Sequence, residues 1–247
     1  MASTRLIFGF HAIQTLLKQR PEVIQNLWVD GHRRDTRMQK FCEFAESVAI
    51  KPQRIQTERL DRLVAGESHQ GVVAEIHDTK PQHYDLETLL DALETPPLLL
   101  ILDGIQDPHN LGACLRNADA FGADALIIPK DRSAPLTPAA KKVASGAAET
   151  VPLITVTNLA TTLRDLKQRG IWVLGAAGEA EESLFTADLS GPIAWVLGAE
   201  GDGLRRLTRE TCDRLISIPM MGHVESLNVS VSAGVCLYAT QQQRYKA

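Results

Sequence analysis

The sequence predicts an α/β protein whose larger, C-terminal part holds a parallel sheet with helices on its faces. From Leu98 onward, short apolar runs alternate with stretches whose apolar residues recur at helical spacing. That alternation is typical of parallel strands joined by crossover helices. The run LLLILD at 98–103 is apolar up to its last residue, as expected of a strand buried on both faces.

A smaller α/β domain is predicted over residues 1–77, because strand-like and helix-like pieces also alternate there. Its expected strands are 5–8, 26–29 and 71–76, and its expected helices are 11–19, 37–47 and 57–64. Thr57 is expected to cap the last helix, since a threonine oxygen can accept a hydrogen bond from a helix N-terminal amide. The polar stretch DTKPQHY at 78–84 is typical of a linker, so the larger domain is expected over 85–247.

The larger domain is expected to begin with an acidic helix at 85–94, which carries a stripe of leucines and is stopped by Pro96 and Pro97. After 98–103, further strands are expected at 125–128, 153–156, 171–175, 193–197 and 215–218. Helices are expected between them at 111–121, 138–144, 158–169 and 204–214, with a last helix after Asn228. Open sheets of this kind bind ligands at the carboxyl ends of their strands, so function is expected in the loops there.

Composition disfavours several classes of protein. The 247 residues are 44% hydrophobic, enough for a sizeable core, yet no apolar run approaches the length of a membrane span. The N-terminus MASTRLIFGF lacks a secretory signal, so a cytoplasmic location is expected. The four cysteines lie far apart without a C-x-x-C pair. That spacing argues against a zinc site and a disulfide scaffold, and no metal is expected.

The charge is uneven along the chain. Residues 1–77 carry 11 Lys and Arg against 9 Asp and Glu, giving +2; the remainder carries 15 against 21, giving −6, for a net −4. The basic excess is compatible with an RNA-binding surface on the smaller domain. In the loop DGHRRDTR at 30–37, Arg33 and Arg34 could contact phosphates or face solvent. His69 could likewise contact RNA or serve as a turn residue before a strand.

The loop GAEGDG at 198–203 follows an expected strand and precedes an expected helix, which invites a dinucleotide-binding hypothesis. Its glycine spacing is G-x-x-G-x-G, whereas the dinucleotide fingerprint is G-x-G-x-x-G. Glu200 and Asp202 would also repel a pyrophosphate. A Rossmann oxidoreductase is therefore disfavoured, and the loop suits a neutral or cationic ligand better.

Three polar clusters follow expected strands of the larger domain: DPHNLGACLR at 107–116, GAEG at 198–201 and SLNVS at 226–230. Asn110 is placed as a helix cap, and Arg116 lies six positions on, nearly two helical turns away. Taken singly, Asn110, Ser226 and Asn228 are more often caps than catalysts, and an arginine is more often a surface ion-pair partner. Their combination is more informative than any of them alone.

N-L-G-x-x-x-R, G-x-E-G and S-L-N-V-S, in this order and at these distances, resemble the three motifs of the SpoU ribose methyltransferases, members of the SPOUT superfamily. GFHAI near the start and HQG at 69–71 resemble the N-terminal substrate domain of the rRNA-modifying members. The resemblance covers the whole chain. It implies transfer of a methyl group from S-adenosylmethionine to the ribose 2'-hydroxyl of a guanosine in 23S rRNA, by a homodimer with a deep trefoil knot. A tRNA ribose methyltransferase and a non-catalytic ribosome-associated RNA-binding protein are the alternatives.

The resemblance also implies roles for individual residues. Arg116 would be catalytic, with Asn110 and Asn228 orienting it and the ribose, and Glu200 holding Arg116 or a neighbouring amide. The residues expected around the cofactor are Leu197, Gly198, Ile218, Leu227, Ala176, Gly178, Met220 and Ser226. Arg132 and Lys141 are further RNA contacts, expected beside the catalytic cleft.

Overall fold

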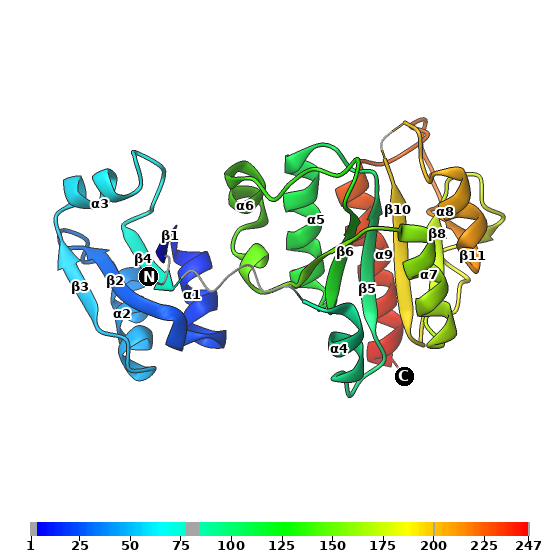
Figure 1. Cartoon of the computed structure of the whole chain (residues 1–247). Helices are drawn as coiled ribbons and strands as arrows, with labels where there is room; N and C mark the ends of the chain where they lie inside the picture. Colours follow the sequence, from blue (N-terminus) through cyan, green and yellow to red (C-terminus); the bar gives the residue numbers. More distant parts are fainter. Residues whose placement is uncertain (1–3, 78–83, 200, 247) are drawn as a thin grey trace. The chain divides into compact units, whose positions relative to one another are not determined.

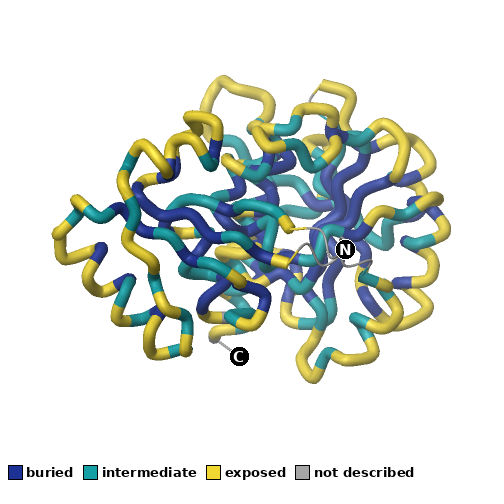
Figure 2. The backbone as a smooth tube through the Cα atoms, turned by 60° about the vertical axis from the view of Figure 1, so that its left-hand side comes forward, coloured by how far each residue is buried: buried dark blue, intermediate teal, exposed yellow. Residues whose placement is uncertain are grey.

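The computed structural model describes residues 4–77, 84–199 and 201–246 of the chain. The chain divides into two compact units, Met1–His83 and Tyr84–Ala247 (Figure 1). In both units the strands are largely buried, while exposed residues gather on the outer sides of the helices and in the loops (Figure 2). Each unit has its own hydrophobic clusters, so each is described separately.

The smaller unit is a four-stranded mixed sheet with helices on both faces. Its strands are β1 (Thr4–Phe8), β2 (Ile24–Asp30), β3 (Pro52–Ile55) and β4 (Val72–His77), in the order β1-β4-β2-β3. Its helices are α1 (Phe10–Gln19), the 3-10 turn η1 (Pro21–Val23), α2 (Thr36–Ser47) and α3 (Thr57–Leu63). β4 is antiparallel to both neighbours, and β2 and β3 are parallel because α2 carries the chain across between them.

One of the predicted helix caps in this unit is wrong. Gln56 occupies the cap position of α3, and Thr57 is the first helical residue. The Thr57 hydroxyl instead donates a hydrogen bond to Asp30 Oδ2 (3.1 Å). Because Thr57 lies one residue inside the helix, its oxygen is not at the cap position, and its hydrogen bond joins the start of α3 to the end of β2. Strand β3 was not predicted, since its sequence PQRI shows no apolar alternation.

The larger unit is built on a seven-stranded sheet whose recorded strand pairs are all parallel. Its strands are β5 (Leu98–Asp103), β6 (Ala125–Pro129), β7 (Leu153–Val156), β8 (Trp172–Ala176), β9 (Glu182–Ser183), β10 (Ile193–Gly198) and β11 (Arg214–Ser217). Their spatial order is β7-β6-β5-β10-β8-β11-β9. Its helices are α4 (Leu86–Asp91), α5 (Pro108–Ala120), α6 (Pro138–Ala144), η2 (Ala147–Glu149), α7 (Leu159–Gln168), α8 (Arg206–Thr211) and α9 (Val229–Lys246). The predicted α/β class is confirmed.

Alternate residues of the central strand serve two cores. Leu98, Leu100 and Leu102 pack into a cluster with α5 and α9, while Leu99 and Ile101 pack with α7 and the partly buried leucines of α4. All five side chains are fully buried, which explains the unbroken apolar run. The long helix α9 is fastened to β10 by a buried hydrogen bond from Trp195 Nε1 to Thr240 Oγ1 (2.9 Å).

The segment after β10 departs from the predicted boundaries. A helix was predicted over 204–214, but α8 covers Arg206–Thr211 alone. Asp213 ends that segment by joining the sheet: its N–H donates to Val173 O (2.8 Å), and its Oδ2 accepts from Val173 N (2.9 Å). Arg214 then begins β11, which ends at Ser217, so Ile218 lies in the following loop.

Candidate active site

The candidate active site forms where β5, β10, β8 and β11 end beside one another. These four strands are neighbours in the sheet and run parallel, so their carboxyl ends share one edge. The register places Gly198 beside Asp103, and Ile216 beside Ala176. All three polar clusters singled out in the sequence follow these strands, as expected for ligand sites in parallel sheets.

The first cluster begins α5, though its cap is Asp107 rather than Asn110. The Asp107 carboxylate accepts from His109 N (2.9 Å), and Pro108 occupies the first turn, where its missing N–H is not needed. Asn110 lies inside the first turn of the helix. Gly112 is required by packing, because a Cβ there would lie 2.3 Å from the carbonyl oxygen of Ala140 in α6.

Two asparagines join the first and third clusters. Asn228 Nδ2 donates to Asn110 Oδ1 (3.0 Å), across 118 positions of sequence. The other end of the Asn228 amide caps α9, since its Oδ1 accepts from the N–H (2.9 Å) and hydroxyl (2.6 Å) of Ser230. Asn117 Nδ2 also donates to Ser230 O (2.6 Å). The start of α9 is therefore fixed against α5 by amide side chains.

Arg116 is exposed on α5, beside a groove between α5 and α9. The groove encloses about 490 Å³ and is lined by Arg116, Asn117, Ser230, Gly234 and Tyr238, among others. Within the described part of the chain, the side chain of Arg116 makes no hydrogen bond or ion pair. A guanidinium with no partner among these residues keeps its donors for a ligand.

The second cluster is a tight loop after β10. A Cβ on Gly198 would lie 2.0 Å from the carbonyl carbon of Gly203, so only glycine fits there. Gly203 N donates to Ala199 O (2.9 Å), and Gly201 and Gly203 have φ of 83° and 65°, a region that favours glycine. Glu200 lies outside the described residues.

A buried ion pair holds the end of this loop, and sequence analysis missed it. The side chain of Asp103, at the end of β5, is fully buried. Its Oδ2 accepts from the backbone N–H of Arg205 (3.1 Å) and its Oδ1 from Arg205 Nε (2.5 Å). A buried carboxylate is tolerated when it is paired and hydrogen-bonded in this way. The signal in the sequence was a lone aspartate that ends an otherwise apolar strand.

The residues expected around a cofactor lie on the loops after β8, β10 and β11. Leu197 is buried, Gly198, Ala176, Ile218, Met220 and Leu227 are half-buried, and Gly178 and Ser226 are exposed. Among the described residues, the main-chain groups of Ile218, Met220 and Leu227 make no hydrogen bond. These loops thus combine apolar side chains with unused main-chain donors and acceptors. None of the eight residues lines the groove beside Arg116 as the structure describes it.

The RNA contacts predicted in the smaller unit differ in availability. Arg34 is exposed, whereas Arg33 is engaged within the unit. Its Nε donates to Asp35 Oδ2 (2.8 Å), its Nη1 donates to Gln70 O (2.5 Å), and its guanidinium lies 5.1 Å from the ring centre of Phe10. The hydrogen bond from Arg33 also lowers the pKa of the Asp35 carboxyl.

His69 is an interior residue of the smaller unit. It is buried, with Nε2 2.9 Å from Asp61 Oδ1 and Nδ1 accepting from Gly71 N (2.9 Å). Both ring nitrogens are therefore occupied in shaping the turn before β4, which favours the turn interpretation over RNA contact. The signal in the sequence was the neighbouring Gly71, since glycine is common in tight turns. In the structure its φ is 84°, in the region that favours glycine.

The two cations expected beside the cleft lie on different elements. Arg132 is exposed in the loop after β6, with a left-handed φ of 61°. Lys141 is half-buried on α6, and its Nζ lies 3.9 Å from Glu149 Oε1. Arg132 is therefore the more open of the two.

Thiol and metal chemistry have no support at this site. Burial raises the pKa of Cys114, Cys212 and Cys236 to about 12, so these thiols stay protonated at neutral pH. In the described ranges, no group of three or more His, Cys, Asp or Glu side chains could hold a metal ion.

The helices of the described residues include none that is long and apolar enough to cross a membrane.

Comparison with known proteins identifies the family. The model of the SpoU rRNA Methylase family matches residues 97–238. The chain belongs to the SpoU family. A second model, RNA 2'-O ribose methyltransferase substrate binding, matches residues 6–82, so the two SpoU-associated models fall in the two structural units.

Relatives of this SpoU protein match it over nearly its whole length. It is 55% identical to the 23S rRNA (guanosine-2'-O-)-methyltransferase RlmB of Ralstonia nicotianae, over 99% of this chain and 98% of that one. It is 52% identical to RlmB of Bordetella pertussis, over 99% of each chain. The SpoU methyltransferase AviRb of Streptomyces viridochromogenes, solved with the cofactor AdoMet, shares the fold with a TM-score of 0.74 at 23% identity, over 99% of this chain and 92% of that chain.

Proposed function

We propose that this protein transfers a methyl group from S-adenosylmethionine to the ribose 2'-hydroxyl of a guanosine in 23S rRNA. The observation that carries the proposal is the 55% identity, over almost the full length, to a methyltransferase with that activity. The site supports it independently, because Arg116 without a described partner lies on the same helix as the Asn110–Asn228 contact. Only RNA offers the 2'-hydroxyl, so the substrate is RNA.

The loops after β8, β10 and β11 fit S-adenosylmethionine. Ile218, Met220 and Leu227 present apolar side chains and unused main-chain groups, and a Cβ on Gly178 would meet nothing within 4 Å. The bound cofactor supplies a methyl group activated by a positively charged sulfur. A loop with the acidic sequence GAEGDG suits that positive charge better than it would suit a phosphate.

Arg116 acts on the oxygen that receives the methyl group. A guanidinium is not deprotonated in proteins, so Arg116 does not remove the proton itself. It stabilises the negative charge that develops on the ribose oxygen, or the adjacent phosphate, while the proton leaves by a relay. Asn110 and Asn228 hold each other and orient the ribose. Glu200 is a further residue proposed for positioning Arg116.

The active form is proposed to be a homodimer. Val231 and Tyr238 on α9 are 49% and 56% exposed, large apolar side chains that line the same groove as Arg116. A second copy would cover them and bring the active site close to the subunit interface. The family's trefoil knot is consistent with the strand order, in which β8 lies between β10 and β11 although β10 and β11 are consecutive in sequence. A 23S rRNA substrate places the enzyme in the cytoplasm.

Methyl transfer to separated RNAs tests the proposal. The protein is incubated with methyl-labelled S-adenosylmethionine and with unmodified 23S rRNA, 16S rRNA or tRNA, each transcribed in vitro. The expected result is label in 23S rRNA alone. Label in tRNA alone would favour a tRNA ribose methyltransferase of the same family. A folded protein that binds RNA but labels none of these substrates would favour a non-catalytic RNA-binding role.

A further inference from the structure

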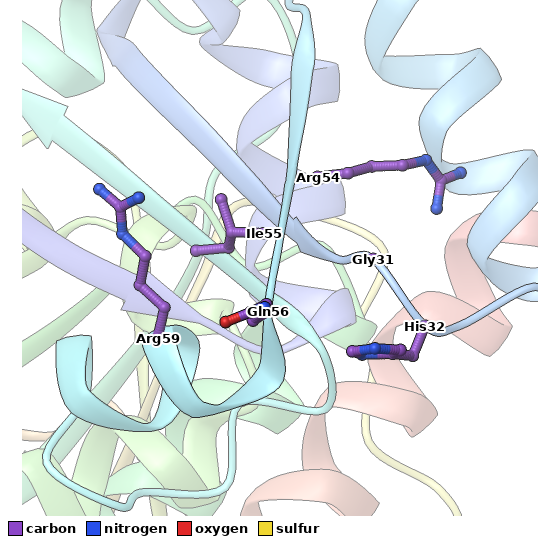
Figure 3. Close-up of a pocket in the computed structure, with 6 residues that line it drawn as sticks. All are labelled: Gly31, His32, Arg54, Ile55, Gln56 and Arg59. Carbon is purple, nitrogen blue, oxygen red and sulfur yellow. The ribbon is translucent and has the colours of Figure 1, made fainter.

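The smaller unit contains an open pocket that the sequence analysis did not identify. It encloses about 400 Å³ and lies where the parallel strands β2 and β3 end. Gly31 N donates to Ile55 O (2.8 Å) and closes the floor of the pocket. The full lining is Gly31, His32, Arg54, Ile55, Gln56 and Arg59 (Figure 3).

The pocket is cationic and its lining contains no carboxylate. Two arginines and a histidine reach it from three segments: the loop after β2, strand β3 and helix α3. The guanidinium of Arg59 has no hydrogen-bond or ion-pair partner among the described residues. Arg54 makes one long hydrogen bond to Arg33 O (3.4 Å), which leaves most of its five N–H donors unused.

Asp30, the acidic residue that precedes Gly31 in sequence, is occupied by the unit itself. Its side chain is only 10% exposed. Oδ1 accepts from the backbone N–H of His32 (2.8 Å), and Oδ2 accepts from the Thr57 hydroxyl (3.1 Å). Asp30 therefore shapes the loop that carries His32, and its charge is not directed to a ligand in the pocket.

The cationic groups surround the floor without meeting at one point. Arg54 and Arg59 extend in different directions on either side of Ile55, and the His32 ring lies on the side of Gly31 (Figure 3). A single small anion would be held by side chains that converge on it. Cations spaced around a shallow, partly apolar floor match an extended polyanion instead, because successive phosphates along a strand can each meet one cation.

We propose that this pocket binds backbone phosphates of the RNA substrate, with Arg54 and Arg59 as the principal contacts and Ile55 as an apolar surface beneath a sugar or base. The inference rests on the proposed function, since it requires an RNA substrate. The proposal assigns the main phosphate contacts to Arg54 and Arg59 rather than to Arg33, whose guanidinium already donates to Asp35 and Gln70. Phosphate contacts of this kind position the RNA without reading its sequence.

The test compares two double variants of the full-length protein. Arg54→Gln with Arg59→Gln removes two charges from the pocket. Lys40→Gln with Arg62→Gln removes two charges from exposed positions of the same unit that do not line it. Binding of a labelled 23S rRNA fragment is measured by fluorescence anisotropy at several salt concentrations. We expect the pocket variant to weaken binding about tenfold and to lower the salt slope by about two, with little change in the control.

A third variant, Arg54→Lys with Arg59→Lys, keeps the charges and should retain most of the slope. Equal losses in the pocket and control variants would show a non-specific charge effect and overturn the proposal. Unchanged binding by the pocket variant would also overturn it. So would competition by inorganic phosphate at constant ionic strength, which would indicate a small-anion site. A wild-type protein that methylates no RNA would instead count against the proposed function.

Discussion

At the scale of single residues, the site depends on which arginine is available. Arg205 is bound to buried Asp103, Arg209 is paired with Glu179, and Arg214 with Glu182. Arg116 has no such partner among the described residues. An unpaired cation on the helix that also carries Asn110, which is hydrogen-bonded to Asn228, is expected of a group that meets developing substrate charge.

Arg116→Ala should lower turnover by roughly a hundredfold or more, as expected when a group that stabilises developing charge is removed. Affinity for S-adenosylmethionine should change by less than about twofold. The proposed cofactor contacts lie on other loops, so only indirect effects of the substitution would reach them. Arg116→Lys should restore little activity, since lysine lacks the planar fork. Single-turnover methylation and calorimetry measure the two effects. Near-normal turnover in Arg116→Ala would exclude the proposed role.

Residue-level prediction from sequence failed where three-dimensional geometry, rather than residue type, decided the outcome. Asparagine often caps helices, but Asp107 lies about one turn closer to the start of α5 than Asn110 and takes the cap position. The contact of Asn110 with Asn228 spans 118 positions and no local pattern reveals it. His69 has the polarity of a surface contact, yet both ring nitrogens are engaged in the interior.

At the scale of elements, the loop after β10 is held at both ends. Gly198 packs directly on Gly203 at one end, and Arg205 is bound through backbone and side chain to Asp103 at the other. The two ends of the loop are therefore anchored, although three of its residues are glycines. Anchored ends lower the cost of ordering main-chain groups around a ligand.

Asp103→Asn should weaken this anchoring. It leaves a buried amide in place of a buried carboxylate that accepts two hydrogen bonds from the partly exposed Arg205, so the free energy of unfolding should fall by about 1–3 kcal/mol. The Kd for S-adenosylmethionine should rise by more than about threefold, roughly the effect of 0.7 kcal/mol. Denaturant unfolding and calorimetry provide the two measurements.

Arg209→Gln is the matched control, because it breaks an ion pair between partly exposed side chains and should cost less than about 1 kcal/mol. If Asp103→Asn behaves like this control in both measurements, the buried pair does not hold the loop.

Strands with apolar sequences were predicted more accurately than strands with polar sequences. The buried strand Leu98–Asp103 and the edge strand Leu153–Val156 have the predicted bounds, because each is a largely continuous hydrophobic or β-branched run. The edge strands Pro52–Ile55 and Glu182–Ser183 were missed, since their pairing rests on main-chain hydrogen bonds that the sequence does not display. The helix after β10 was predicted to be longer than it is. Asp213 is as polar as the residues of Arg206–Thr211, so polarity did not indicate where the helix ends.

At the scale of the whole molecule, we expect the larger unit to bind the cofactor and the smaller unit to bind much of the RNA. Each has its own hydrophobic clusters, and the residues proposed for the cofactor and catalysis all belong to the larger one. A fragment of residues 84–247 should therefore fold and dimerise. It should bind S-adenosylmethionine within about threefold of the full chain, a difference of roughly 0.7 kcal/mol.

The same fragment should lose most of its affinity for 23S rRNA, at least about tenfold, because the phosphate contacts of the smaller unit are gone. Circular dichroism and sedimentation check folding and association, calorimetry checks the cofactor, and filter binding checks the RNA. A fragment that methylates 23S rRNA as well as the full chain does would assign RNA recognition to the larger unit, with Arg132 and Lys141 as the first residues to examine.

The α/β class followed from the alternation of apolar runs and helical periodicity, whereas the strand order did not. Local pattern says nothing of which strands are neighbours, and the insertion of β8 between β10 and β11 brings together loops that are distant in sequence. The motif resemblance supplied what periodicity could not, by predicting one site for Arg116, Asn110 and Asn228, of which the two asparagines are hydrogen-bonded to each other. The cationic pocket around Arg54 and Arg59 carries no motif and became visible only in three dimensions.

The most direct test of the central claim is the identity of the methylated nucleoside. Full-length protein, S-adenosylmethionine and unmodified 23S rRNA are incubated together, and the RNA is digested to nucleosides and separated by mass spectrometry, with Arg116→Ala as the control. The predicted product is 2'-O-methylguanosine, at one position per 23S rRNA molecule, and it should be nearly absent in the control. A methyl group on a base, on a ribose other than that of guanosine, or on no nucleoside of 23S rRNA would contradict the assignment.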